Sequence, residues 1–323
     1  MRYAKTIAAP LLLSALAFAA GGPAQAQSKF PDKPIEMTVL FGGSAQTVGQ
    51  VLADQMSKKL GSPVVAVGRK GGGGAIGYTY VHDTKPDGYN IVWNSNSIST
   101  THYRGNVPFD YKAFVPIAQI GVEVPVFAVR TASGWKTLKD MVADAKKSGK
   151  KLKIAVGGLG SFTHLVAAAL FNRLGLQVIY VPGGQGHEVA ELLAGRVDGV
   201  LRFPSEVASN VKAGTISVLC VASKDVKVEG LDAPSCDAAG ATGMNLSMWR
   251  GLAAPAGTPP EVVAKLQTAA QEAVASPEFQ KAVRNVGFIP HYMPGKAFGQ
   301  EIATDDKEIG ALMKQIGLEK KKK

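Results

Sequence analysis

Short apolar runs rich in branched side chains alternate with helical patterns along most of the chain. This alternation predicts βα units whose strands are largely parallel, as in α/β proteins. At roughly 100 to 200 residues per domain, 323 residues indicate about two domains. Strands are expected at Ile35–Leu40, Val64–Val67, Ile91–Trp93, Val126–Val129, Ile154–Val156, Val178–Val181 and Val218–Ala222.

Helices are expected between these runs and near the carboxyl end. Apolar residues recur at helical spacing from Val48 to Leu60, and Gly61 is positioned to end that helix. Thr258-Pro259-Pro260-Glu261 predicts a capping box that opens a later helix. Ser276-Pro277 separates it from the next helix, and a last helix should carry Phe298 to Ile316.

The first 26 residues have the pattern of a secretory signal peptide. Arg2 and Lys5 precede an apolar run from Ile7 to Ala20, and Ala24-Gln25-Ala26 supplies the small residues that signal peptidase accepts. The run is shorter than the ~20 apolar residues of a membrane span. We therefore expect cleavage after Ala26 and export to the periplasm, where nicotinamide and nucleotide cofactors are not retained.

The composition is that of a folded, basic protein. With 46% apolar and 19% charged residues, the chain can bury a large core. Its 36 Lys and Arg against 25 Asp and Glu give a net charge of +11 and favour an anionic partner. Basic pairs such as Lys58-Lys59 and Lys146-Lys147 are scattered without interleaved aromatic residues, which argues against nucleic acid.

Three glycine-rich turns each lie between an expected strand and an expected helix. They are Phe41–Thr47, Gly157–His164 and Pro182–Glu188. The first turn of a helix leaves backbone N–H groups unpaired and carries about +0.5 charge, so it suits a carboxylate or a phosphate. Ligands of open α/β sheets bind at the carboxyl ends of strands, so three such turns together predict a site for an acid.

Other motifs give no support for an enzyme. Gly72–Gly77 satisfies G-x-G-x-x-G, but no acidic residue follows the next strand to hold a ribose. Ser161 and His164 could share a helix face, yet no acid is placed to orient the imidazole. The pairs His82-Asp83 and His187-Glu188 are adjacent and diverge, so we expect no metal site, no cofactor and no catalytic residue.

Two cysteines leave one structural question open. Cys220 lies in the strand-like run ISVLCVAS and Cys236 in the loop SCDAAG. Export makes a disulfide possible, but two buried thiols would satisfy the sequence equally well. The separation of their Cα atoms decides between the two.

Several segments together resemble one family, the periplasmic solute-binding proteins of tripartite tricarboxylate transporters, known as Bug or TctC proteins. The resemblance runs from about residue 30 to residue 317 and includes FPDKPIEMTVLF, GGSAQTVGQVLA, KPDGYNIVWNSNS, LLAGRVD and MWRGLAAPAGTPPEVVAKL. It implies a type II Venus flytrap fold, in which two α/β lobes with mostly parallel sheets close around one small carboxylate. The implied lobes are 27–123 with 248–323, and 124–247. We expect a monomer that works with membrane transporter subunits.

The resemblance also implies which segments contact the ligand. The turns after the first and the fifth expected strands would hold a carboxylate, and two further segments would line the cleft. The implied ligand-binding residues are Gly42, Gly43, Ser44, Gln46, Asn94, Ser95, Asn96, Ser161, Phe162, Thr163, Gly183, Gly184, Gln185, Arg202 and Arg250.

Two departures from the family pattern and one match to it bear on the ligand. Gln46 stands where the family commonly has Asp, so an amino-acid ligand is disfavoured, because Gln46 offers no charge to an ammonium. Arg202 falls where many members have Asp, and Arg250 follows Met248-Trp249 as in tricarboxylate-type members. We therefore hypothesise a second ligand carboxylate near Arg202 or Arg250. The alternative is that either arginine makes an ordinary surface ion pair.

Two functions from other classes remain alternatives at this point. One is a ligand-sensing module that presents its closed form to a signalling receptor. The other is an exported enzyme that acts on an organic acid through Ser161 and His164.

Overall fold

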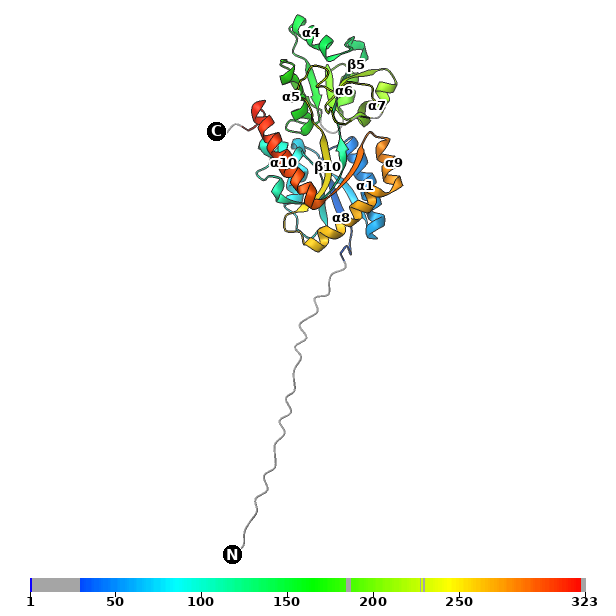
Figure 1. The fold of residues 1–323 in the computed structure, drawn as a ribbon, viewed down its shortest axis with the longest axis vertical. Coiled ribbons are helices and arrows are strands. Elements are labelled where there is room, and N and C mark those ends of the chain that lie inside the picture. The colour runs from blue at the N-terminus through cyan, green and yellow to red at the C-terminus, as the bar shows by residue number, and fades with distance from the viewer. Residues whose placement is uncertain (2–29, 184–186, 227, 229, 321–323) are drawn as a thin grey trace.

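The computed structural model describes residue 1 and residues 30–183, 187–226, 228 and 230–320. The expected signal peptide, Gly184, Gln185 and the last three lysines lie outside the described residues. Two sheets, each flanked by helices, are arranged one beyond the other along the long axis of the molecule (Figure 1).

The first sheet has six strands in the order β11-β4-β10-β3-β1-β2. Its central part is buried on both faces, since α1 and α8 pack on one side and α2 and α3 contribute to the other. The strands are β1 (Ile35–Val39), β2 (Val64–Gly68), β3 (Asn90–Ser95), β4 (Phe114–Glu123), β10 (Met248–Pro255) and β11 (Ile289–Pro294). The helices are α1 (Ser44–Leu60), α2 (Ala75–His82), α3 (Ser97–Tyr103), α8 (Pro260–Ala275), α9 (Pro277–Arg284) and α10 (Gly295–Gln315).

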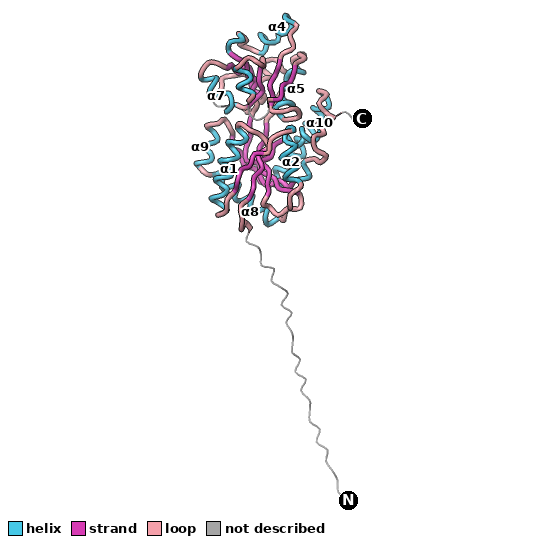
Figure 2. Tube along the Cα trace, turned by 180° about the vertical axis from the view of Figure 1, so that it is seen from behind, coloured by secondary structure: helices cyan, strands magenta, loops and turns pink. Residues whose placement is uncertain are grey.

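The second sheet has five strands in the order β7-β6-β8-β5-β9 and is built from the middle of the chain. Its core is a single apolar cluster that includes Phe127, Phe171 and Leu201. The strands are β5 (Val126–Arg130), β6 (Lys153–Val156), β7 (Ile179–Pro182), β8 (Gly199–Arg202) and β9 (Ile216–Val221). The helices are α4 (Leu138–Ser148), α5 (Phe162–Arg173), α6 (Glu188–Leu193) and α7 (Pro204–Lys212), and Figure 2 shows the strands enclosed by helices.

The α/β prediction is confirmed, but the sheets are mixed and not mostly parallel. β1 pairs in parallel with β2 and β3, and β6 pairs in parallel with β7 and β8. The strands β10, β4, β11, β5 and β9 pair antiparallel to their neighbours. The reason is the chain path: β4 leads directly into the second sheet and β10 returns from it, so these two strands run in opposite directions.

Some of the helix ends form as the neighbouring residues predict, and one does not. Gly61, at φ 64°, ends α1, and the Ser276 hydroxyl accepts the Phe279 N–H at 3.2 Å, as expected of a cap. The expected Thr258 capping box is wrong, because the Thr258 hydroxyl donates back to the Pro255 carbonyl at 2.8 Å. Pro259 occupies the cap position of α8 without a side-chain cap.

The last helix, α10, packs against both sheets. Phe298 and Ile302 belong to a core cluster of the six-stranded sheet, whereas Ile309 and Met313 belong to the core of the five-stranded sheet. Tyr103 donates to the Asp306 carboxylate at 3.0 Å and fixes α10 beside α3. The helix therefore ties the two parts of the molecule together along one side.

No helix in the described part of the chain has the length and apolarity that crossing a membrane requires.

Cys220 and Cys236 form a disulfide, with Cα atoms 4.8 Å apart. It joins the end of β9 to the loop that returns toward β10, and both residues are fully buried. The open question of the two cysteines is thereby answered in favour of pairing.

Because the disulfide closes a 16-residue loop, its removal should lower the free energy of unfolding by about 3 kcal/mol. Urea unfolding of the double variant Cys220→Ala/Cys236→Ala tests this. A reducing agent should lower the midpoint of the parent protein and leave that of the variant unchanged. An equal response of both proteins to the reducing agent would contradict it.

Candidate functional site

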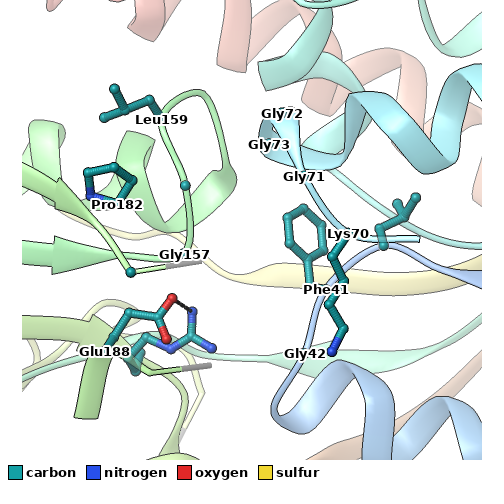
Figure 3. Close-up of a pocket in the computed structure, with 14 residues that line it drawn as sticks. Phe41, Gly42, Lys70, Gly71, Gly72, Gly73, Gly157, Leu159, Pro182 and Glu188 are labelled. Atoms are coloured by element: carbon teal, nitrogen blue, oxygen red, sulfur yellow. Dashed lines mark hydrogen bonds and ion pairs between the residues drawn. The ribbon is translucent and has the colours of Figure 1, made fainter. Parts of the chain in front are cut away.

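A cavity of about 400 Å³ lies between the two sheets, at the carboxyl ends of their parallel strands. The six-stranded sheet contributes the turns that follow β1 and β2, and the five-stranded sheet contributes the turns that follow β6 and β7 (Figure 3). Ligands of open α/β sheets bind at this end of the strands. The lining residues are Leu40, Phe41, Gly42, Lys70, Gly71, Gly72, Gly73, Gly157, Gly158, Leu159, Pro182, Gly183, Glu188 and Arg202.

Glycine allows the turns of the two sheets to approach one another across this cavity. Gly43 has φ +65°, and a Cβ there would lie 1.7 Å from the Glu206 carboxylate of the other sheet. A Cβ on Gly73, at φ +70°, would lie 3.1 Å from the Leu159 carbonyl. A larger residue at Gly43 would displace the Glu206 side chain, whereas at Gly73 it would press on the backbone of the facing turn, and at both positions it would be strained by the positive φ.

The hydroxyls of the β6–α5 turn are engaged in shaping the turn. Ser161 is the N-cap of α5 and accepts the His164 N–H at 3.4 Å. Thr163 Oγ1 lies 3.0 Å from Ser161 Oγ and accepts the Gly157 N–H at 3.0 Å. In the β1–α1 turn, the buried Ser44 hydroxyl has no hydrogen-bond partner among the described residues, and Ser44 does not line the large cavity.

Arg202 reaches the cavity from the end of β8 and is held by two carboxylates. Its Nη1 donates to Glu188 at 3.4 Å, and its Nη2 makes a close contact with Glu206. Burial disfavours the charged guanidinium, but Glu206 and Glu188 outweigh burial, so the pKa of Arg202 lies above its ordinary value. Arg202 is thus a charged wall residue whose charge is already compensated.

Arg250 lies deeper and is also paired. Its Nε donates to Glu123 at 2.6 Å, and both side chains are 2% exposed. Its Nη1 has no partner among the described residues. Arg250 lines a second cavity of about 20 Å³, which shares Phe41, Gly157 and Arg202 with the large one. Both arginines are therefore ion-paired, but in buried positions, whereas the alternative supposed ordinary pairs on the surface.

The expected ligand residues divide into those that meet at the cleft and those that do not. Gly42, Gly183 and Arg202 line the large cavity, and Ser161, Phe162, Thr163, Arg202 and Arg250 line the small one. Gln46 is exposed and accepts a hydrogen bond from Lys70 at 2.9 Å. Gly184 and Gln185 lie outside the described residues.

The polar run Asn94-Ser95-Asn96 lies at the end of β3, beside the segment in which the chain returns from the second sheet. Asn94 accepts hydrogen bonds from Tyr78 and from the Ser95 N–H, both at 2.8 Å, and it lines a separate cavity of about 190 Å³. The Asn96 amide donates to the Ser247 carbonyl at 3.1 Å, where the chain returns from the second sheet. Ser95 and Asn96 line neither cleft cavity.

Two charged residues that line the cavity, Lys70 and Glu188, are not among the expected ligand residues. Lys70 follows β2 in a loop without a helical cap signal. Glu188 is the last residue of the third glycine-rich turn, Pro182–Glu188, and its place at the start of the following helix was the available signal.

His164 is a core residue, and its imidazole makes no hydrogen bond to the Ser161 hydroxyl. Its side chain is buried, and its Nδ1 accepts the Gly160 N–H at 3.1 Å. The ring packs edge-on against Tyr180, with centroids 4.7 Å apart. Burial, assisted by the charge of Arg104, lowers the pKa of His164 to about 4. In the described residues, no group of three or more potential ligand side chains could hold a metal ion.

Comparisons with known proteins agree with this geometry. The model of the TctC family, described as tripartite tricarboxylate transporter family receptor, matches residues 48–318. The UPF0065 protein in the tcbD-tcbE intergenic region of Pseudomonas sp. strain P51 is 31% identical over 270 residues, which cover 82% of this chain and 80% of the relative. The periplasmic binding protein BugD is 30% identical and superposes with a TM-score of 0.84, over 90% of this chain and all of BugD.

A more distant likeness shows the fold alone. Rpa4515 of R. palustris, solved with adipate, is 22% identical and has a TM-score of 0.83 over 89% of this chain and 98% of its own.

The buried imidazole of His164 predicts a pH dependence of stability. The pKa is about 4 in the folded protein and 6.5 when exposed, so the unfolded chain binds the proton more tightly between these values. The contribution of His164 is complete above pH 6.5 and falls by about 3 kcal/mol as the pH drops toward 4.

Urea unfolding from pH 4 to 7 measures this. His164→Gln should show a flatter pH profile than the parent protein, whereas the exposed His291→Gln should keep the parent slope. Identical slopes for His164→Gln and the parent would refute the assignment.

Proposed function

Because the chain belongs to the tripartite tricarboxylate transporter receptor family (TctC/Bug), we propose that it captures a small carboxylate in its cleft and delivers it to the membrane subunits of such a transporter. Family members are periplasmic solute-binding proteins, and BugD, 30% identical, carries that description. The same location is proposed for this chain, because its first 26 residues have the pattern of a secretory signal peptide.

The observation that carries the proposal is the cavity of about 400 Å³ lined by turns from both sheets. Its volume lies within the ~300–1,000 Å³ of small-molecule sites. A ligand there contacts both halves of the molecule, which is the condition for a ligand to favour a closed form. Gly42 and Gly157, from opposite sheets, supply backbone to the same space.

A carboxylate suits this space because of the helix ends around it. α1 begins directly after the Gly42 turn with 17 residues, and α5 begins with 12 residues after the Gly157 turn. Each helix end favours an anion by about 0.3–1 kcal/mol, and each hydrogen bond to a charged group adds about 1.5–3 kcal/mol. A few such contacts supply the ~8 kcal/mol of micromolar binding after association costs.

Two cationic side chains, Lys70 and Arg202, line the cavity wall from opposite sheets. Lys70 lines the cavity from the six-stranded sheet, and its partner Gln46 is neutral, so its charge is uncompensated by that contact. Arg202 faces it from the other sheet with its two glutamates. The fold itself accommodates a dicarboxylate, since Rpa4515 holds adipate.

Binding without turnover is the expected mechanism. His164 uses its Nδ1 for the Gly160 N–H, so it is not placed to remove a proton from Ser161. Closing of the two halves requires only that the ligand contact both of them more strongly in the closed form. The closed form would then be the species that the membrane subunits recognise.

A thermal-shift screen of the mature protein tests the proposal. Small di- and tricarboxylates should raise the melting temperature, because a ligand at 100 times its Kd stabilises the folded state by about 2.7 kcal/mol. Neutral amides and esters of the same skeletons serve as controls and should have no effect. Stabilisation by the neutral controls, or by no acid in the panel, would reject a carboxylate-binding function.

The contribution of Lys70 gives a mutational test. Lys70→Ala should weaken the stabilising acid by about fivefold in calorimetry at low salt, and the difference should shrink at high ionic strength. Lys58→Ala, in the last turn of α1, is the matched control and should leave the Kd unchanged. Equal affinities of both variants would remove Lys70 from the site.

A further inference from the structure

Glu188 is an acidic residue in the wall of a cleft otherwise suited to anions. It is the first residue of α6, it lines the large cavity, and only 1% of it is exposed. Figure 3 shows its side chain bordering the space that Phe41 and Gly42 border on the other side. An acidic side chain in that position repels a ligand carboxylate, so its presence needs a reason.

The hydrogen bonds of Glu188 are incomplete. Its Oε1 meets Arg202 Nη1 at 3.4 Å, and its buried Oε2 has no partner among the described residues. Glu206, by contrast, makes the closer contact with Arg202 and also accepts the Phe203 N–H at 3.1 Å. The guanidinium is therefore matched by Glu206, and Glu188 keeps unused acceptor capacity.

The charges do not balance within the cluster of Arg202, Glu188 and Glu206. Arg202 contributes one positive charge, and the two carboxylates Glu188 and Glu206 contribute two negative ones. The neighbouring pair of Arg250 with Glu123 is neutral. A buried excess of negative charge is unfavourable unless a donor or a cation meets it.

Gly183, directly after β7, lies against this side chain. A Cβ on Gly183 would lie 2.3 Å from Glu188 Cγ and 3.1 Å from its Oε1. Glycine at 183 therefore leaves the room in which the carboxylate lies between the turn and Arg202. The position of Glu188 is built into the cleft and is not that of a surface side chain.

We propose that the acid bound in this cleft also carries a hydroxyl or a protonated amine, whose hydrogen bond the Glu188 carboxylate accepts. For an amine, Glu188 supplies the negative charge that the exposed Gln46, outside the cavity lining, does not. The inference rests on the proposed carboxylate-binding function. The ligand carboxylate lies at the turns of Gly42 and Gly157, and the donor lies toward the α6 side. Glu188 then discriminates against plain acids, because it leaves their second carboxylate facing a like charge.

The test compares acids of equal skeleton with and without a donor: succinate, malate and aspartate, then glutarate, 2-hydroxyglutarate and glutamate. In calorimetry at pH 7, at least one donor-bearing member should bind about tenfold or more tightly than its plain parent. Glu188→Gln and Glu188→Ala should reduce this preference at least fivefold. The same variants should bind the plain acid more tightly than the parent protein does, because the repulsion is removed.

Glu191→Gln is the matched control, since Glu191 lies on the same helix and pairs on the surface with Arg196. It should keep the parental preference. Both Glu188 variants should melt near the temperature of the parent protein, because Arg202 keeps its ion pair with Glu206. Such melting temperatures exclude a folding defect as the cause of any change in affinity.

The outcomes separate this inference from the proposed function. Plain acids that bind as tightly as every donor-bearing analogue overturn the role of Glu188 and leave carboxylate binding intact. A preference for donor-bearing acids that persists in Glu188→Ala would likewise overturn the role of Glu188 and leave carboxylate binding intact. Failure of all acids to bind overturns both. If Glu188→Gln weakens the binding of the ammonium-bearing acid alone, the donor is a protonated amine. If it weakens the hydroxyl-bearing and the ammonium-bearing acids equally, the hydrogen bond is the feature that Glu188 recognises in both.

Discussion

The pairing of β4 with β10 is the constraint on which the cleft depends. β4 leaves the six-stranded sheet directly for β5, and β10 re-enters it after β9, so the two strands form the joint between the halves of the molecule. Met248 lies opposite Glu123 in this ladder. The buried pair of Arg250 with Glu123 sits at the same place. With the joint fixed there, the carboxyl ends of the parallel strands of both sheets face the same space.

The electrostatic character of that space is more balanced than the net charge of the chain suggests. Glycine-rich turns in a basic protein would present only hydrogen-bond donors and positive charge to a ligand. The wall of this cavity also contains the carboxylate of Glu188, beside Arg202. Two arginines that face a cleft with their charges compensated act as structural supports until a ligand competes for them. Selectivity then comes from the arrangement of donors and acceptors and less from the sum of charges.

Much of the site could be predicted from the sequence, because its parts follow local rules. The three glycine-rich turns come directly after apolar strands, and Gly42, Gly157 and Gly183 do line one cavity. The family resemblance, carried by the motifs around these turns, is confirmed by the family model. Helix ends at Gly61 and Ser276 likewise follow from neighbouring residues.

The remainder depends on contacts that no local pattern encodes. β10 was missed because it is buried throughout and contains Arg250 and a glycine, so it shows no alternation. Asn94 resembled a cleft residue, but tertiary packing against Tyr78 decides its role. Glu188 and Arg202 become partners only when β8 and α6 pack together.

The central claim is that one small acid is held simultaneously by the turns of both sheets. A crystal structure of the mature protein with its most stabilising acid tests this most directly. We expect one ligand carboxylate within about 2.7–3.2 Å of backbone N–H groups in both the β1–α1 and the β6–α5 turns. A ligand that contacts the turns of one sheet only, or that lies outside the space between the sheets, would contradict the claim.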